Sequence, residues 1–395
     1  MDRASVFSKY KTVAGQSFSV GSFGRGDFRL RVANTNETEC DEFVRALVND
    51  GFVLTDDRVI PAKYPEQKNR FFLLSNDKGA VFVFYNGVTK DCFITLENEK
   101  TIVFKGNEYV EKLVNVTVGQ VDFVKGMGYI VQFENGEFLL IDGGEKGYST
   151  AQKTYEYLLE RVPAGGKPTI ALWIFTHAHH DHIGMATEFF KEYSSKVTVR
   201  AFAYQFPEPA CLQVSMENGA KIKEFSDCFE RLLKEKYPLA TIYTPHTGQA
   251  FNFAGAKMEI LYSPDDTYPS YYTNFNELSL AFSLQFDNGK KLLFLGDCMG
   301  DGCRRMATTY GEYLKSDYLQ LAHHGLIGGD RTLYELVNPK VCLWATDEER
   351  FTGEGESGFR WCLGEGGCDY NAWIRDEKVA VRKHYCYGKK LVLEL

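Results

Sequence analysis

The chain has 395 residues, of which 44% are hydrophobic, and a formal net charge of −8 at pH 7. This length suffices for one large domain or two ordinary ones, and the apolar content supports a sizeable core. The acidic balance, with no long basic run, argues against a protein that mainly grips a nucleic-acid backbone.

The N-terminus leads into polar sequence and lacks the apolar core of a signal peptide, so we expect a cytoplasmic protein. No apolar stretch approaches the roughly 20 residues of a membrane span, so we expect no membrane partner. Ten cysteines are scattered along the chain without a C-x-x-C pair. This pattern predicts reduced, mostly buried thiols and not a disulfide framework.

Residues 1–110 are predicted to form a separate α+β unit. We expect a helix over 39–49 and short strands over 28–32, 71–74, 80–85 and 92–96, separated by turns rich in Asn, Asp and Gly. This unit contains no chemical motif. Its role is left open between a docking module, a dimerisation module that would give a homodimer, and a wall of the substrate cleft.

Residues 111–395 are predicted to form two strand-rich halves, divided near residue 240. Strands are expected over 115–120, 128–133, 137–141, 170–175 and 196–206, then over 257–262, 276–286, 291–295 and 317–322. Helices are expected over 149–161 and 219–237. Residues 331–395 are expected to add helix and strand to the second half, with a long Gly-rich loop over 353–367.

The strand over 170–175 runs into Thr-His-Ala-His-His-Asp-His, which holds four of the eight histidines within six residues. Neutral imidazole and carboxylate are ordinary ligands of zinc and related ions. His177 and His179 alternate with Ala178, so in extended backbone they point the same way and can share one ion. Asp181 and His182 come where the chain turns into a helix, so they suit a second ion.

This T-H-x-H-x-D-H pattern after a hydrophobic strand resembles the metal-binding motif of the metallo-β-lactamase superfamily. The resemblance covers residues 111–395 and implies an α+β fold, a four-layer αββα sandwich with the site at the seam between two sheets. The N-terminal α+β unit would be an addition to it. A strand ending in Asp-Gly-Gly at Asp142 is similar to the superfamily's first motif, where the aspartate steadies the His-rich loop.

Two later motifs are similar to hydrolases related to the metal domain of bacterial DNA-uptake channels and to a phosphorylcholine esterase branch. The first is N-x-x-S-L from Asn276, followed by a strand, a turn and a strand ending in Gly-Asp. It implies that Asp297 bridges two metals, because the two oxygens of a carboxylate can reach separate ions. The second is a strand followed by His323-His324-Gly. One of these histidines would bind the second metal and the other would contact substrate or protonate the leaving group, and the sequence does not decide between them.

Several further residues are candidates for the site. His246 is the one histidine between the central motif and Asp297, where many superfamily members supply a third ligand to the first ion. Its Pro-His-Thr-Gly context first indicates a turn; otherwise His177 and His179 hold that ion with water or another group. Tyr271 and Tyr272 of an aromatic loop, with Asn276, are candidate substrate contacts.

The resemblance implies a binuclear metal-dependent hydrolase, with two zinc ions favoured and manganese or iron as alternatives. The favoured substrate is a phosphoester or phosphodiester. Asp181 and whichever of His323 and His324 is not a ligand are the candidate catalytic groups. The alternatives are a lactone or amide hydrolase, a mono-iron persulfide-type dioxygenase, and a non-catalytic binding protein. Fold resemblance alone does not fix function.

Overall fold

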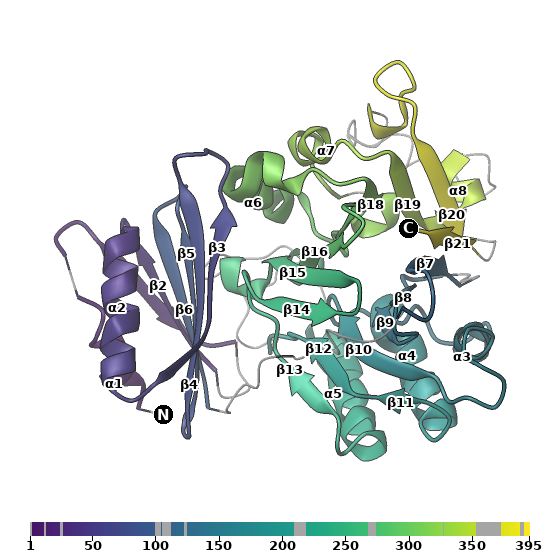
Figure 1. The fold of residues 1–395 in the computed structure, drawn as a ribbon, viewed down its shortest axis with the longest axis horizontal. Helices are drawn as coiled ribbons and strands as arrows, with labels where there is room; N and C mark the ends of the chain where they lie inside the picture. The colour runs from purple at the N-terminus through teal and green to yellow at the C-terminus, as the bar shows by residue number, and fades with distance from the viewer. Residues whose placement is uncertain are drawn as a thin grey trace.

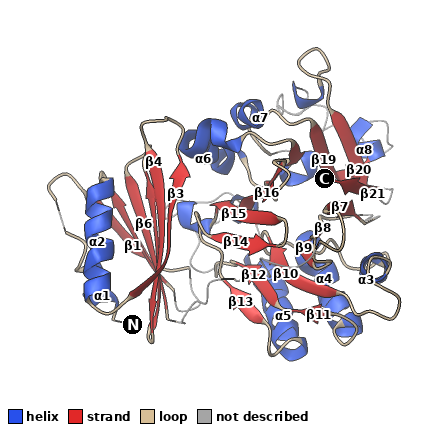
Figure 2. Cartoon of the chain, in the orientation of Figure 1, coloured by secondary structure: helices blue, strands red, loops and turns tan. Residues whose placement is uncertain are grey.

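The computed structural model describes residues 2–11, 13–23, 27–98, 104, 112–121, 125–208, 219–267, 274–326, 328–352, 373–387 and 391–395. These residues form three sheets with helices packed outside them (Figure 1 and Figure 2). The expected fold class is confirmed: an α+β chain with an αββα sandwich and an extra N-terminal α+β unit. No helix in this described part has the length and apolar character needed to cross a bilayer.

The N-terminal sheet is antiparallel throughout, with the strand order β1-β2-β6-β5-β4-β3. Its strands are β1 (Ser17–Gly21), β2 (Phe28–Ala33), β3 (Val53–Pro61), β4 (Lys68–Asn76), β5 (Gly79–Asn86) and β6 (Asp91–Glu97). Helix α2 (Glu37–Asn49) begins after Asn36, whose side chain caps it by accepting a hydrogen bond from the amide of Glu39. The short helix α1 (Arg3–Phe7) lies near it (Figure 1).

Strand β5 shows why this sheet is buried on both faces. Successive side chains of a strand point to opposite faces. Val81 and Val83 pack into the core beneath α2, whereas Phe82 and Phe84 join a second core. That second core also contains Leu261 of the neighbouring sheet and residues of helix α6 (Gly300–Tyr310). The N-terminal unit therefore docks with an apolar face on the rest of its own chain.

The second sheet has the order β13-β12-β10-β9-β8-β7-β21, and the short β11 also pairs with β10. Strands β9, β10, β11, β12 and β13 are parallel, whereas the pairs β8–β9, β7–β8 and β7–β21 are antiparallel. The strands are β7 (Thr117–Gln120), β8 (Tyr129–Gln132), β9 (Phe138–Ile141), β10 (Thr169–Phe175), β11 (Thr198–Val199), β12 (Ala201–Tyr204), β13 (Thr241–Tyr243) and β21 (Leu391–Glu394).

The third sheet has the order β14-β15-β16-β17-β18-β19-β20, antiparallel as far as β17 and parallel beyond it. Its strands are β14 (Ala250–Phe253), β15 (Ala256–Tyr262), β16 (Ala281–Phe286), β17 (Lys291–Phe294), β18 (Tyr318–Gln320), β19 (Val341–Asp347) and β20 (Lys383–Tyr387). The short 3-10 turns η2 (Pro264–Thr267), η3 (Phe275–Leu278), η4 (Gly311–Leu314) and η5 (Ala322–Gly325) lie between these elements.

The second and third sheets face each other, and helices cover their outer faces (Figure 1). Across the interior, Phe133 stacks on Phe253 with the ring centroids 4.4 Å apart. On the outer side of β10, Trp173 meets Phe189 of helix α4 edge-on at 5.3 Å. Helices α3 (Thr150–Leu159), α4 (His180–Tyr193) and α5 (Gly219–Lys236) cover the second sheet, and α6, α7 (Arg331–Val337) and α8 (Glu348–Thr352) belong to the third.

Three sequence expectations differ from the structure. The strand expected over 196–206 is broken at Arg200 into β11 and β12, and β16 begins only at Ala281 because Phe275–Leu278 forms a 3-10 turn. The last strand, β21, pairs with β7 of the second sheet, so the chain end does not simply extend the second half. The loop expected over 353–367 lies outside the described residues.

Candidate metal centre

The site is built at the carboxyl ends of two pairs of neighbouring parallel strands. Asp142 directly follows β9 and His177 follows β10, its parallel neighbour. Asp297 follows β17 and His324 follows β18, which are also parallel neighbours. Because parallel strands end at the same edge of a sheet, each pair of side chains is brought together there. Because the two sheets face each other, both pairs of side chains lie at the seam between the sheets.

Strand β10 ends at Phe175 and helix α4 begins at His180, so the His-rich segment spans a strand-to-helix turn, as expected. His179 is the N-cap residue and has extended backbone angles, φ −72° and ψ 149°. Asp181 and His182 lie in the first turn of the helix. The ring of His182 is fully buried. His180, which is not a predicted ligand, is exposed, and its Nε2 atom lies 3.8 Å from Oε1 of Glu145.

Four of the predicted ligands converge closely. Nε2 of His182 lies 3.1 Å from Oδ2 of Asp297, and Nε2 of His324 lies 3.4 Å from the same oxygen. The Nε2 atom of His324 is also 3.3 Å from Oδ2 of Asp181. Asp181, His182 and His324 form one group whose ligand atoms all lie within 4.8 Å of one another, close enough to hold an ion.

A second such group consists of His177, His182 and Asp297. Nε2 of His177 lies 3.9 Å from Oδ2 of Asp297. The same Nε2 atom lies 2.9 Å from Nδ1 of His179, within hydrogen-bonding distance. The structure therefore brings together six of the ligands expected from the sequence, with His182 and Asp297 at the centre.

Unsatisfied buried atoms show that these residues fit a cation. Nε2 of His182, Nε2 of His324 and Oδ1 of Asp297 are buried without a hydrogen bond to any described residue. The two ring nitrogens lie near Asp297 but do not meet it with hydrogen-bond geometry. Buried polar groups are nearly always satisfied, so three such atoms on neighbouring side chains are unusual. Metal ions bound at the cluster would satisfy them.

The charge state of the carboxylates also suits a metal. Burial raises the pKa of Asp297, but the neighbouring His182, His324 and His323 outweigh it and hold this pKa well below its usual range. Burial likewise raises the pKa of Asp181, and His182 and His324 reverse the shift and lower it. Both carboxylates are therefore ionised at neutral pH, as metal ligands must be.

Asp142 orients His182 from behind, the role expected for it. Its Oδ2 atom lies 2.8 Å from Nδ1 of His182, and its other oxygen accepts a 2.7 Å hydrogen bond from the amide of Thr176. The Thr176 hydroxyl donates a third, at 2.8 Å. A carboxylate accepts, so Nδ1 of His182 carries the proton and Nε2 is left for an ion.

Contacts that the sequence did not predict orient the other two rings. Nδ1 of His324 lies 2.9 Å from the carbonyl oxygen of Ala345, which can only accept, so Nδ1 carries a proton and Nε2 is the nitrogen that faces the cluster. Nδ1 of His177 lies 3.1 Å from the Thr176 hydroxyl and 3.2 Å from the Ser279 hydroxyl. The Ser279 oxygen also accepts a 3.1 Å hydrogen bond from the amide of Asp297. The sequence did not predict these contacts because a hydroxyl group that orients a ring has no recognisable motif, although Ser279 is the serine of N-x-x-S-L.

His323 occupies a different place from His324. Both residues have left-handed backbone angles, with φ values of 49° and 60°, which turns their side chains in different directions. Nε2 of His323 is 3.8 Å from Oδ2 of Asp297, and its side chain is 18% exposed. Nδ2 of Asn276 lies 3.4 Å from the same nitrogen. His323 is thus more exposed than His324 and lies beside Asn276. Tyr271 and Tyr272 lie outside the described residues.

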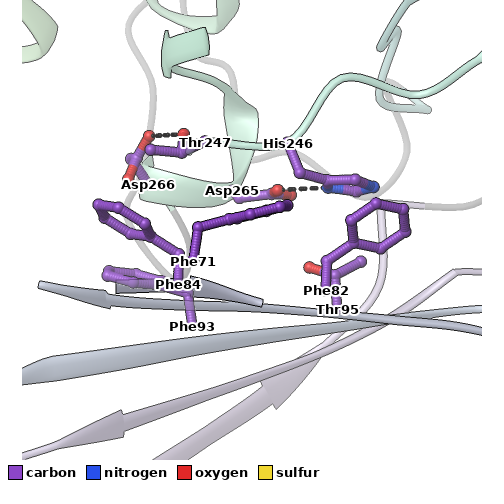
Figure 3. Close-up of a pocket in the computed structure, with 9 residues that line it drawn as sticks. All are labelled: Phe71, Phe82, Phe84, Phe93, Thr95, His246, Thr247, Asp265 and Asp266. Carbon is purple, nitrogen blue, oxygen red and sulfur yellow. Dashed lines mark hydrogen bonds and ion pairs between the residues drawn. The ribbon is translucent and has the colours of Figure 1, made fainter. Parts of the chain in front are cut away.

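The structure does not bring His246 to the cluster. Its Nδ1 atom lies 2.6 Å from Oδ2 of Asp265 and its Nε2 atom 3.0 Å from Oε1 of Glu97, so both nitrogens are occupied. Figure 3 shows the ring between Asp265 of η2 and Phe82 of the N-terminal sheet. Burial lowers the pKa of His246, but Asp265 and Glu97 outweigh it and raise this pKa to about 9.

His246 is thus part of a buried chain of alternating charges between the N-terminal sheet and the sandwich. Arg29 of β2 donates from Nε to Oδ1 of Asp265 at 2.8 Å, and Gln205 donates to the same oxygen at 3.1 Å. Glu97 closes the other end of the chain at His246. A second link of this kind joins Arg58 of β3 to Glu259 of β15 at 3.4 Å. Pairing of this kind offsets part of the cost of burying the charges.

Neither a protein-family model nor a curated protein matches the sequence. Solved structures of similar arrangement include CmlA, a diiron beta-hydroxylase from Streptomyces venezuelae, with a TM-score of 0.42, 12% identity and coverage of 77% of this chain and 55% of that chain. Unliganded yeast PDE1 has a TM-score of 0.39, 9% identity and coverage of 69% and 97%. A long form RNase Z from yeast has a TM-score of 0.32, 12% identity and coverage of 68% and 46%.

The chain thus spans about half the length of CmlA. At these TM-scores none of the likenesses assigns an activity, and the functional proposal rests on the geometry of the site.

Proposed function

We propose that the chain is a binuclear metal-dependent hydrolase that acts on a phosphoester or phosphodiester. The observation that carries the proposal is the convergence of His182, His324 and Asp297, each with a buried atom that has no hydrogen-bond partner among the described residues. Imidazole and carboxylate ligands of this kind suit zinc, with manganese and iron as alternatives.

In the proposed centre, His177 and His179 would hold one ion, and Asp181, His182 and His324 would hold the other. Asp297, which lies close to both groups, would be shared between the two ions. The hydrogen bond from His324 to the Ala345 carbonyl supports the choice of His324 over His323 as the ligand. His323 is then the residue that contacts substrate, beside Asn276.

Two ions bound here would supply a hydroxide at neutral pH by lowering the pKa of water, and would stabilise charge on the substrate oxygens. The chain's own contribution is to hold the ligands in place and to exclude bulk water. Asp142, Thr176 and Ser279 fix the rings from behind, and the buried walls of the seam keep the local dielectric low, which strengthens each electrostatic contact. The phosphoester is favoured by the Gly-Asp and His-His-Gly motifs.

The test is metal content followed by hydrolysis of a panel of phosphomonoesters, phosphodiesters, lactones and β-lactams. We expect close to two ions per chain and turnover of a phosphoester substrate. Replacing Asp297 with Asn should reduce the occupancy of both ions, because it removes the shared negative charge. Asp301→Asn is the matched control, since Asp301 is 73% exposed in the first turn of α6. Two tightly bound ions in Asp297→Asn would remove the bridging role.

A further inference from the structure

We infer that the two metal positions are unequal: the position at Asp181, His182 and His324 binds its ion first and tightly, and the position at His177 and His179 binds later and weakly. This inference rests on the proposed function, because it concerns the same metal centre. It adds an order of loading and a consequence for regulation.

The tighter position is prepared for an ion by its surroundings. It has two ionised carboxylates, Asp181 and Asp297, beside the rings of His182 and His324. Both rings are fixed through Nδ1, one by Asp142 and one by the Ala345 carbonyl, so Nε2 of each faces the centre. Neither Nε2 atom has a hydrogen-bond partner among the described residues, and the carboxylates that lie close to them are themselves proposed ligands of the ion.

The weaker position differs in each of these respects. Nε2 of His177 already lies 2.9 Å from Nδ1 of His179, so an ion must break a hydrogen bond between its own two ligands. His179 belongs to neither group of described residues whose ligand atoms are close enough to hold an ion. The position has no carboxylate of its own and shares Asp297 with its neighbour.

The histidine that would complete the weaker position is held elsewhere. Both nitrogens of His246 bond carboxylates of the charge chain at the N-terminal sheet. Releasing this ring would remove one hydrogen-bond partner from each of Asp265 and Glu97, which costs more at a buried site than the loss of an exposed contact would. Among the described residues, the position at His177 and His179 therefore lacks a third histidine ligand.

Affinity for a divalent ion rises with the number of anionic ligands and with their preorganisation. The tighter position has two carboxylates and two oriented rings, whereas the weaker position has two rings and only the shared carboxylate. We expect this difference to separate the two affinities by at least tenfold, which corresponds to about 1.4 kcal/mol. At limiting metal the chain would then hold one ion and lack the second. Metal supply would thus set the fraction of chains with a complete centre.

The test is calorimetric titration of the full-length, chelator-stripped protein with zinc chloride, repeated with cobalt(II), whose visible absorption reports the ligands of each ion. We expect two events separated by at least tenfold in affinity. His179→Gln should remove the weak event and leave one tight ion per chain. His324→Gln makes the same chemical change at the tighter position, so it should lower the affinity of the tight binding event. Circular dichroism and thermal melting of both variants confirm that each is folded.

The outcomes separate the two proposals. Two events of equal affinity, or loss of the tight event in His179→Gln, would overturn the unequal positions and leave the binuclear hydrolase standing. No zinc or cobalt binding by the folded wild-type chain would overturn the proposed function itself. One tight and one weak event, with the variants acting as stated, supports both.

Discussion

Oδ2 of Asp142 lies 2.8 Å from Nδ1 of His182, and both side chains are fully buried. Replacing Asp142 with Asn keeps the size of the side chain but can present an NH2 group to a ring nitrogen that must donate. We expect zinc affinity to fall about 10- to 100-fold, the usual effect of losing such a partner. Competition with a chromogenic chelator measures the change.

Asn is the right substitution at this position because residue 142 has a φ of 54°. Asn tolerates left-handed backbone better than most residues, so the backbone should not move. Unchanged zinc affinity in Asp142→Asn would show that His182 does not need its partner.

Removing the Ser279 hydroxyl tests the contact that links the two halves of the centre. This hydroxyl is 3.2 Å from Nδ1 of His177 and accepts from the amide of Asp297. In Ser279→Ala we expect weaker binding at the His177 position and an altered cobalt spectrum for that ion, with the first ion little changed. Ser283→Ala is the control, since Ser283 is also buried and lies on β16, shortly after Ser279. Equal effects of the two substitutions would assign Ser279 to packing alone.

A methyl group at Gly325 should disturb the turn that carries His324. A Cβ there would come within 2.1 Å of the indole ring of Trp344, and the residue has a φ of 78°. We expect Gly325→Ala to destabilise the fold by at least 2 to 3 kcal/mol, roughly the cost of overpacking a core. Gly289→Ala, at a φ of 85° with open space around it, carries only the backbone cost of about 1 kcal/mol. Thermal melting compares them, and equal losses would contradict the clash.

The charge on His246 predicts how stability depends on pH. Its folded pKa of about 9 lies above the usual 6.5, so its contribution is complete below pH 6.5 and disappears as the pH rises through 9. The shift corresponds to roughly 3 kcal/mol. The stability advantage of the wild type over His246→Gln should therefore shrink by about this amount between pH 6 and pH 10. Asp265 has a lowered pKa, so its protonation affects stability only below about pH 4, outside this range.

Chemical denaturation at several pH values measures this difference. An advantage that stays constant across the range would mean that folding does not change the pKa of His246. An advantage that grows with pH would reverse the assigned sign.

Much of the sandwich and of its centre could be predicted, because the signals are local. The apolar strand 170–175, the dense histidines after it and the strand endings at Asp142, Asp297 and His324 each depend on a few consecutive residues. The structure places each of them where the strand order requires.

What the sequence did not show depends on contacts between distant segments. His246 and Glu97 are 149 positions apart, and no spacing rule connects them. The proposal of His324 over His323 as the ligand rests on the contact with the carbonyl of Ala345, a group that every residue carries. Strand β3 was missed because Asp56, Asp57 and Arg58 interrupt its apolar pattern, although Arg58 pairs with Glu259 across the interface.

The double-sided burial of the N-terminal sheet has a practical consequence for anyone who wishes to shorten this chain. Phe71, Phe82 and Phe84 share a core with Leu261 and Met306, so cutting before residue 111 would expose an apolar surface. The cut would also remove Arg29 from Asp265 and Glu97 from His246. Residues 111–395 alone should therefore aggregate during purification. The N-terminal unit, which has no chemical motif, covers an apolar surface of the rest of the chain.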